Sequence, residues 1–169
     1  MTGTPRDSDQ DQIGLLRVGA EAFEVIAALY GRSFDDPWPA PSVRELLSTP
    51  LTWAILALDR ESETPIGFVI ARTVVDEGEI LSIAIEPQNR RAGIGARLLA
   101  GTLDRMAEEG AVSVFLEVGT DNPGAMEFYL AAGFMTIGTR SNYYLRKDGS
   151  RHDALVMRKN LSIQQYDDC

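Results

Sequence analysis

A short basic and glycine-rich segment does more than any other to constrain the fold of this chain. The apolar run 81–85 ends just before it, and a helix with its apolar residues on one stripe begins just after it. A turn of this kind leaves backbone N–H groups unpaired at a helix N-terminus, where the helix dipole favours negative charge. The sequence therefore predicts a strand, a phosphate-binding turn and a helix, in that order. The turn consists of Arg90, Arg91, Ala92, Gly93, Ile94 and Gly95.

The spacing of the glycines limits which phosphate ligand this turn can hold. It lacks the GxGxxG spacing of dinucleotide-binding folds and the Gly-Lys-Ser/Thr sequence of P-loop enzymes. Neither NAD nor ATP is therefore the expected ligand. A plainer alternative stays open, because helix starts often use glycine simply to turn the chain.

Composition favours one soluble domain and excludes several classes of protein. The chain has 169 residues, of which 44% are hydrophobic and 24% charged, which suits a single domain with its own core. With 25 acidic and 16 basic side chains, the net charge of −9 argues against nucleic-acid binding; it serves solubility or attracts a cationic substrate. The single cysteine, Cys169, excludes an intramolecular disulfide, and no metal is expected. Because no run is long and apolar enough for a membrane span or a secretory signal, we expect a cytoplasmic protein without a membrane partner.

The first half of the chain predicts a strand, two helices and a meander of three further strands. Prolines at positions 37, 39 and 41 force a loop. Ser42 is expected to cap a short second helix, which Pro50 ends. The strands are predicted over residues 15–18, 52–58, 66–75 and 79–85, and the first helix over residues 21–30.

The second half predicts an α/β arrangement around the glycine turn. Residues 112–118 alternate apolar and polar side chains, as a strand does. Asn122 is expected to cap the next helix, and Gly133 to end it. Two last strands are predicted near residues 134–144 and 154–158. The expected fold class is therefore α/β, with a mixed and mostly antiparallel sheet of about six or seven strands flanked by about four helices. The domain is expected over residues 13–161, with flexible tails over 1–12 and 162–169.

The turn and the strand before it resemble the GCN5-related N-acetyltransferase (GNAT) family. That family has Arg or Gln, two residues, Gly, one residue, and then Gly or Ala, a pattern that Arg90, Gly93 and Gly95 match. Its turn binds the pyrophosphate of acetyl-coenzyme A. Within the family the resemblance is to the bacterial ribosomal-protein alanine N-acetyltransferases of the RimI type. It is carried by the blocks Ile83-Ala84-Ile85-Glu86-Pro87, Leu116-Glu117-Val118 with Asn122, Phe128-Tyr129 with Ala132-Gly133-Phe134, and Arg140-Ser141-Asn142-Tyr143-Tyr144 with Asp148-Gly149 and Asp153-Ala154.

The resemblance implies that acetyl-coenzyme A, without a metal, binds along the strand and the turn. The strand is expected to be splayed, so that its backbone pairs with the pantetheine arm as an added strand would and offers an N–H to the thioester oxygen. The same residues also suit a plain sheet core. Asn122 either touches the pantetheine or only caps its helix. The implied cofactor-binding residues are Ile83, Ala84, Ile85, Arg90, Arg91, Ala92, Gly93, Ile94, Gly95, Ala96 and Asn122.

The resemblance implies two catalytic residues, Glu117 and Tyr129. A protein amine with a pKa of about 8 is mostly protonated at neutral pH, so attack on a thioester needs a proton acceptor, which is the role implied for Glu117. The leaving thiol has a pKa of about 8.5, so a donor such as the Tyr129 hydroxyl assists its departure. The alternatives are a solvent-exposed strand carboxylate for Glu117 and core packing for Tyr129.

Three other aromatic side chains each have two alternative roles, and the single histidine has none in the site. Tyr143 and Tyr144 line a peptide channel or are ordinary strand aromatics. Trp38 borders the substrate or covers the core. His152, the only histidine, stands in a polar hairpin where neither a catalytic nor a metal role is expected.

The function expected from the resemblance is direct acetyl transfer from acetyl-coenzyme A to a protein α-amine, without a covalent enzyme intermediate. The first candidate acceptor is the N-terminal alanine of a small-subunit ribosomal protein. A second hypothesis keeps the cofactor but acetylates a lysine side chain or a small-molecule amine. A third, from another class, is a non-catalytic acyl-coenzyme A-binding module that regulates a partner.

Overall fold

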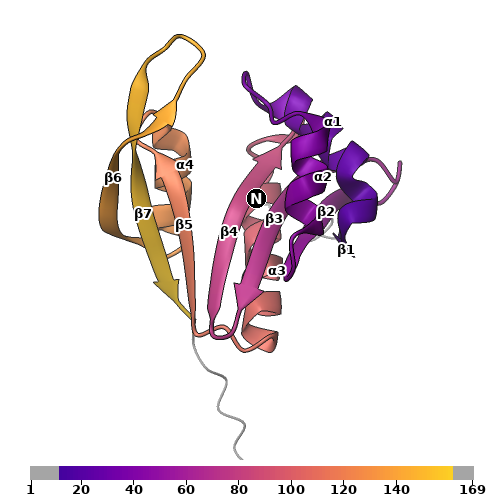
Figure 1. The fold of residues 1–169 in the computed structure, drawn as a ribbon. Coiled ribbons are helices and arrows are strands. Elements are labelled where there is room, and N and C mark those ends of the chain that lie inside the picture. Colours follow the sequence, from indigo (N-terminus) through magenta and orange to yellow (C-terminus); the bar gives the residue numbers. More distant parts are fainter. Residues whose placement is uncertain (1–11, 162–169) are drawn as a thin grey trace, which may run out of the picture.

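The computed structural model describes residues 12–161, which form one seven-stranded sheet with helices on both faces (Figure 1). The predicted tails lie outside the described residues, except for residue 12. The strands are β1 (Ile13–Val18), β2 (Thr52–Asp59), β3 (Pro65–Val74), β4 (Glu77–Ile85), β5 (Ser113–Gly119), β6 (Met135–Leu145) and β7 (Arg151–Asn160). The helices are α1 (Phe23–Ser33), α2 (Ala40–Ser48), α3 (Ile94–Glu108) and α4 (Pro123–Ala131), with 3₁₀ turns η2 (Ala20–Ala22) and η3 (Pro87–Asn89).

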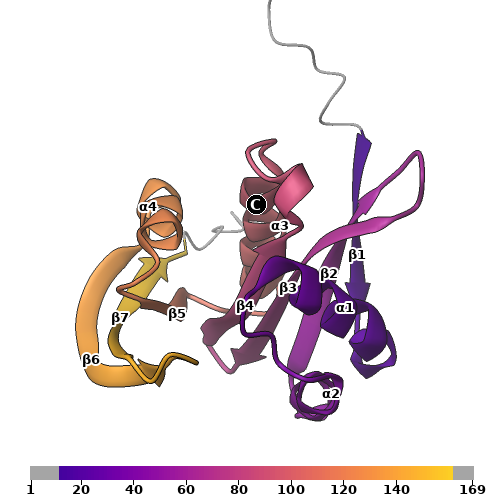
Figure 2. The ribbon, with the colours of Figure 1, turned by 90° about the horizontal axis from the view of Figure 1, so that it is seen from above.

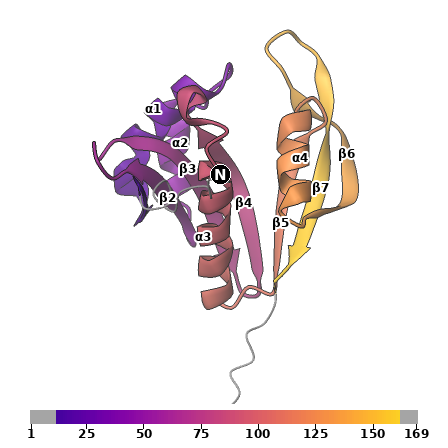
Figure 3. The ribbon, with the colours of Figure 1, turned by 180° about the vertical axis from the view of Figure 1, so that it is seen from behind.

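The sheet has the order β1-β2-β3-β4-β5-β7-β6, and β4 and β5 are its one parallel pair of neighbours. These two strands are paired only from Glu77–Ile80 to residues 113–116, after which they diverge (Figures 1 and 3). The divergence begins at a bulge. Ile80 lies opposite Ala71 of β3 and Ser82 opposite Ile70, so Leu81 has no partner of its own and β4 bends there.

Each face of the sheet carries its own layer of helices (Figure 2). Helices α1 and α2 cover one face of β2, β3 and β4. Helix α3 covers the other face of these strands, and α4 lies on the same side as α3 but over β5, β6 and β7. The first layer centres on Ile26, Leu29, Val43, Phe68 and Ile70, and the second on Leu98, Met106, Val114, Phe134 and Met157, all at most 2% exposed. The predicted mixed, mostly antiparallel architecture is confirmed.

Several predicted boundaries were wrong by a few residues. Helix α2 begins at Ala40 rather than after Ser42, because the Ser42 N–H already donates to the Pro39 carbonyl and Pro41 needs no N–H partner in a first turn. The stretch before α1 forms the 3₁₀ turn η2, and α1 runs on to Ser33. None of the helices in the described part of the chain combines the length and the apolar character that a membrane crossing requires.

Candidate active site

The glycine turn forms a set of backbone donors at the start of α3. Gly93 is the N-cap residue with φ of 77°, and Arg91 also has a positive φ, of 66°. Among the described residues, the N–H groups of residues 91–96 have no hydrogen-bond acceptor, and no side chain caps the helix. The turn itself is exposed, but the Ile94 side chain is buried in the α3 layer and anchors it. The predicted phosphate-binding residues are therefore brought together with their N–H groups available to an anion.

Arg90 has a different part in the turn from its neighbours. Its Nε donates to the Ile85 carbonyl at 3.0 Å, and its Nη2 donates to the Ser33 carbonyl at the end of α1, also at 3.0 Å. The guanidinium thus ties the turn to the end of β4 and to α1. A role for Arg90 in cofactor binding stays a prediction, and the contacts support an indirect one.

Glu86 is a site residue that sequence reasoning missed. Its side chain is only 7% exposed, and its carboxylate accepts hydrogen bonds from Arg32 Nε, from Gln88 Nε2 at 2.9 Å and from Asn89 Nδ2 at 3.4 Å. A buried carboxylate with these partners fixes the η3 turn against the last turn of α1. The signal available in the sequence was an acidic residue directly between an apolar strand and Pro87.

We expect Glu86→Leu to lower the free energy of unfolding by about 1.5 kcal/mol, because its donors lose a charged acceptor but can still reach water. Urea unfolding measures this loss. Glu86→Gln keeps an acceptor oxygen at the same place, so it is the matched control and should lose about half as much. A leucine variant as stable as the parent chain would show that this cluster does not hold the turn.

The second half of β4 lies where the two strands have diverged. Ile83, Ala84 and Ile85 pair with β3 along one edge, and this stretch has no partner in β5. Their side chains pack into both helix layers, Ile83 and Ile85 beside α3 and Ala84 beside α1. Both predicted roles are thus compatible: the side chains form core, and a backbone edge is left for an added strand.

Asn122 caps α4, as predicted. Its Oδ1 accepts a hydrogen bond from the Ala125 N–H at 3.1 Å, and Pro123 follows in the first helical turn. The contact with a cofactor that the resemblance implied for Asn122 is not tested by this geometry and stays a prediction.

Glu117 lies on β5 just past the point where β4 leaves it. Its neighbours Leu116 and Val118 are buried in the layer of α3 and α4, so Glu117 points to the opposite face. Its side chain is 24% exposed, and its Oε1 lies 3.1 Å from Nε of Arg140 on β6. The guanidinium orients the carboxylate, which is compatible with the predicted role as proton acceptor, and that role stays a prediction.

Tyr129 is buried in α4 on the other side of the sheet. Its ring packs edge-on against Phe128 and Phe134, with centroids at 5.2 and 5.7 Å. Burial raises its pKa, so the hydroxyl keeps its proton at neutral pH and can donate a hydrogen bond. The next residue, Leu130, is 56% exposed, because the short helix touches the sheet along a narrow stripe.

Tyr144 lies against the end of the Glu117 strand, because its Cδ2 would be 3.3 Å from a Cβ at Gly119. Burial raises its pKa, and the charge of Glu117 raises it further. Tyr144 in turn acts electrostatically on Tyr129 and on Tyr30 of α1, so it is near residues from α1, α4 and β5. Sequence reasoning left Tyr144 undecided and missed Tyr30, because only the tertiary fold brings β6 and α1 together.

The loop after α1 borders the same region with aromatic side chains. Tyr30, whose pKa burial raises to about 12, stacks on Trp38 with centroids 5.3 Å apart and an interplanar angle of 21°. Trp38 is 43% exposed, so it covers a core residue with one face and meets solvent with the rest. Tyr143 is exposed and lies under Arg140, whose guanidinium carbon is 5.2 Å from the ring centroid.

His152 does not complete a nucleophilic triad. Its Nε2 lies 3.0 Å from Ser150 Oγ and 4.0 Å from Asp121 Oδ2. Because both contacts involve the same ring nitrogen, the carboxylate cannot orient the imidazole toward the hydroxyl as a triad requires. Within residues 12–161, no three His, Cys, Asp or Glu residues are grouped so that they could hold a metal ion.

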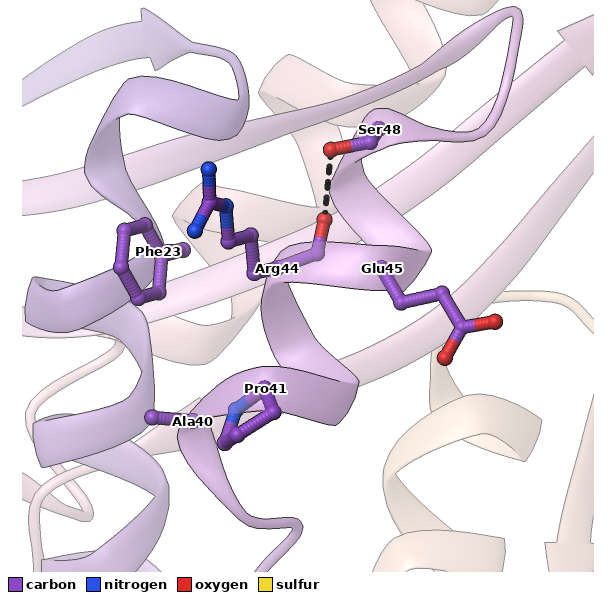
Figure 4. A pocket seen from close by; sticks show the side chains of 6 residues that line it. All are labelled: Phe23, Ala40, Pro41, Arg44, Glu45 and Ser48. Carbon is purple, nitrogen blue, oxygen red and sulfur yellow. Dashed lines mark hydrogen bonds between the residues drawn. The ribbon is translucent and has the colours of Figure 1, made fainter.

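A hollow of ≈ 330 Å³ lies between α1 and α2, away from the diverging strands (Figure 4). Two of its polar side chains, Ser48 and Arg44, already have partners within the protein. Ser48 Oγ donates to the Arg44 carbonyl at 2.7 Å, and the Arg44 guanidinium lies 5.4 Å from the centroid of the Phe23 ring. The hollow therefore offers less to a ligand than the open edge of β4 and the turn beside it.

Comparison with known proteins identifies related sequences. Residues 23–134 match the acetyltransferase (GNAT) family. The ribosomal protein bS18-alanine N-acetyltransferase of Escherichia coli is 35% identical over 97 residues, 57% of this chain and 65% of that protein, so the chain spans just under two thirds of this relative. The N-alpha-acetyltransferase RimI of Mycobacterium tuberculosis is 37% identical over 130 residues, 75% of this chain and 77% of that protein.

Solved structures share the fold. The crystal structure of the Escherichia coli ribosomal-protein-S18-alanine N-acetyltransferase superposes with a TM-score of 0.82 at 24% identity, over 92% of this chain and 97% of that one. Arabidopsis thaliana NAA60 in complex with acetyl-CoA gives 0.77 at 17% identity, over 88% and 98% of the two chains. These superpositions confirm the predicted fold class.

Proposed function

The chain belongs to the acetyltransferase (GNAT) family, and on that premise we propose that it transfers the acetyl group of acetyl-coenzyme A to the α-amine of a protein. One observation carries the proposal. The unpaired N–H groups of residues 91–96 follow directly on the unpaired edge of β4, and Glu117 stands on the strand that diverges from that edge. The N–H groups suit a diphosphate, the unpaired edge of β4 suits an extended amide-bearing arm, and Glu117 lies where the thioester at the end of that arm would be.

The residues present fit acetyl-coenzyme A. The donors at the start of α3 suit the diphosphate, and the backbone of residues 83–85 suits the pantetheine arm. When bound, the cofactor supplies an activated acyl carbon as a thioester. An N–H of the diverged part of β4 then stabilises the oxygen that gains negative charge during attack.

Glu117 and Tyr129 assist the amine and the leaving thiolate from the two faces of the sheet. Glu117 accepts the proton of the acceptor ammonium, directly or through water, and so frees the lone pair for attack. Tyr129 donates a hydrogen bond to the departing thiolate. Its raised pKa makes complete proton transfer to a thiolate unfavourable, so a hydrogen bond is the expected assistance.

The acceptor is proposed from the relatives. The Escherichia coli relative is named as a ribosomal protein bS18-alanine N-acetyltransferase, so the first acceptor to test is the N-terminal alanine of a small-subunit ribosomal protein. The predicted cytoplasmic location goes with this acceptor and stays a prediction. No observation of the structure favours a lysine, a small amine or a purely regulatory role instead.

A peptide experiment tests the proposal. An alanine-terminated peptide with one internal lysine should release free thiol from acetyl-coenzyme A in the presence of the protein. Blocking the peptide N-terminus should abolish release, and mass spectrometry should place the acetyl group on the α-amine. Equal turnover of the blocked peptide would assign the activity to lysine. Tight binding of acetyl-coenzyme A without turnover of either peptide would favour the regulatory module.

We expect Tyr129→Phe to lower kcat by about tenfold while the Kd for acetyl-coenzyme A stays within a factor of about two, because only the hydroxyl is removed. Steady-state kinetics and calorimetry measure the two quantities. Phe128→Leu changes a neighbouring ring without touching that hydroxyl and serves as the packing control. If the Tyr129 variant keeps the parent rate, packing is its whole role.

A further inference from the structure

A paired aspartate and arginine connect the start of α4 to the hairpin between β6 and β7. Asp121 precedes the cap of α4 and receives two hydrogen bonds from Arg146, at 2.7 Å from Nε and 2.8 Å from Nη2. The hydrogen bond from Arg146 lowers the pKa of Asp121, so both groups are charged at neutral pH. Two parallel charge-assisted hydrogen bonds fix a relative orientation as well as a distance.

Tyr144 is held against this pair. The guanidinium carbon of Arg146 lies 4.7 Å from the centroid of the Tyr144 ring, within the range of a cation–π contact. The pair therefore holds the ring of Tyr144, which is also close enough to Glu117 for that carboxylate to raise the pKa of the Tyr144 hydroxyl.

Gly119 shows how closely these three side chains are packed. A Cβ at Gly119 would lie 2.4 Å from Asp121 Oδ1, 2.8 Å from Arg146 Nη2 and 3.3 Å from Cδ2 of Tyr144. Gly119 is two residues beyond Glu117 and ends β5. The space that a side chain would occupy at the end of the Glu117 strand is thus filled by the aspartate, the arginine and the ring.

The backbone alone does not fix Tyr144. The pairing of β6 with β7 is interrupted between Arg140 and Tyr144, and Asn142 within the interruption has φ of 53°. Tyr144 is therefore the first residue of a separate paired stretch on an edge strand, where the register is weakly specified. Lys147, one residue beyond Arg146, contacts the loop after α1 through the Asp35 carbonyl at 3.0 Å and Asp36 at 3.4 Å.

We propose that Asp121 and Arg146 are positioning residues that hold the Tyr144 ring beside Glu117, and so set how an acceptor peptide presents its amine. The inference rests on the acetyl transfer proposed above. It assigns to the pair an effect on the acceptor and none on the cofactor, because neither residue is among the predicted cofactor-binding residues. A pair that only stabilised the fold would affect both.

The test is a double-mutant cycle measured as kinetics with the alanine-terminated peptide. Arg146→Met keeps a long side chain but removes the fork of donors, and we expect it to raise the KM for the peptide about tenfold while the Kd for coenzyme A stays within a factor of about two. In a Tyr144→Leu background, Arg146→Met should have no further effect on KM, because the ring through which it acts is gone. The exchanged pair Asp121→Arg with Arg146→Asp should recover at least half of the loss.

Arg105→Met is the matched control, since Arg105 also forms an ion pair, with Glu109 at 3.2 Å, but on the exposed side of α3. An unchanged peptide KM in Arg146→Met would overturn the inference while leaving the proposed function intact. Equal losses in peptide and coenzyme A binding, or a full further loss in the Tyr144→Leu background, would also overturn it. If the parent chain does not acetylate the peptide α-amine, the proposed function fails and this inference fails with it.

Discussion

Glu117→Gln is expected to lower kcat/KM for an alanine-terminated peptide by about a hundredfold at neutral pH, and by about tenfold at a pH well above the pKa of the amine. The amine is then deprotonated without help, so the loss of the proton acceptor matters less. Glutamine keeps the length of the side chain and an oxygen that can accept from Arg140, so the geometry around it should be retained. The measurement is the pH profile of kcat/KM in both proteins.

Glu79→Gln is the control for this variant. Glu79 is also a partly exposed carboxylate paired with an arginine, Arg72, and it lines the same hollow of the sheet as Glu117. It stands in the part of β4 that is still paired with β5, below the divergence. We expect its kinetics to match the parent chain. Two parallel pH profiles for Glu117→Gln and the parent would exclude Glu117 as the proton acceptor.

Local signals in the sequence predicted the elements that carry the cofactor site. The apolar run predicted β4, the glycines predicted the turn, and the periodic apolar residues predicted α3, each to within a few residues of its observed bounds. Asn122 with Pro123 predicted the start of α4. In each case the residues that begin or end the element are adjacent to it in the sequence. The unpaired N–H groups at the start of α3 could therefore be expected before the fold was known.

Contacts between segments that are distant in the sequence could not be predicted from such local signals. The contacts of Arg90 with the carbonyls of Ile85 and Ser33 could not be predicted, since Ser33 is 57 residues away, and a role of Arg90 in cofactor binding stays a prediction. Tyr144 could equally have been a surface aromatic, because its place beside Glu117 depends on an interrupted strand pairing and on Arg146. Alternation along a strand specifies a face, but it does not specify which side chain of another strand shares that face.

Gly95→Asp is expected to raise the Kd for coenzyme A by about a hundredfold. Gly95 is the second residue of α3, among the N–H groups that have no acceptor in the described chain. A carboxylate there repels a diphosphate by about 3 kcal/mol for unit charges about 6 Å apart at an effective dielectric constant of about 20, which is about two orders of magnitude in affinity. The same carboxylate favours the helix N-terminus, so the variant should remain folded.

Gly95→Ala separates the charge from the added bulk. A Cβ at this position would lie 3.5 Å from ring atoms of Phe128 and 3.8 Å from Cγ1 of Ile85, which are ordinary contacts. Alanine should therefore leave the Kd within a factor of about three and add about 0.5 kcal/mol to the free energy of unfolding, because glycine is a poorer helix former. Calorimetry with coenzyme A and urea unfolding measure both variants. An aspartate variant that binds coenzyme A as tightly as the alanine variant would place the diphosphate elsewhere, and the proposed function would lose the observation that carries it.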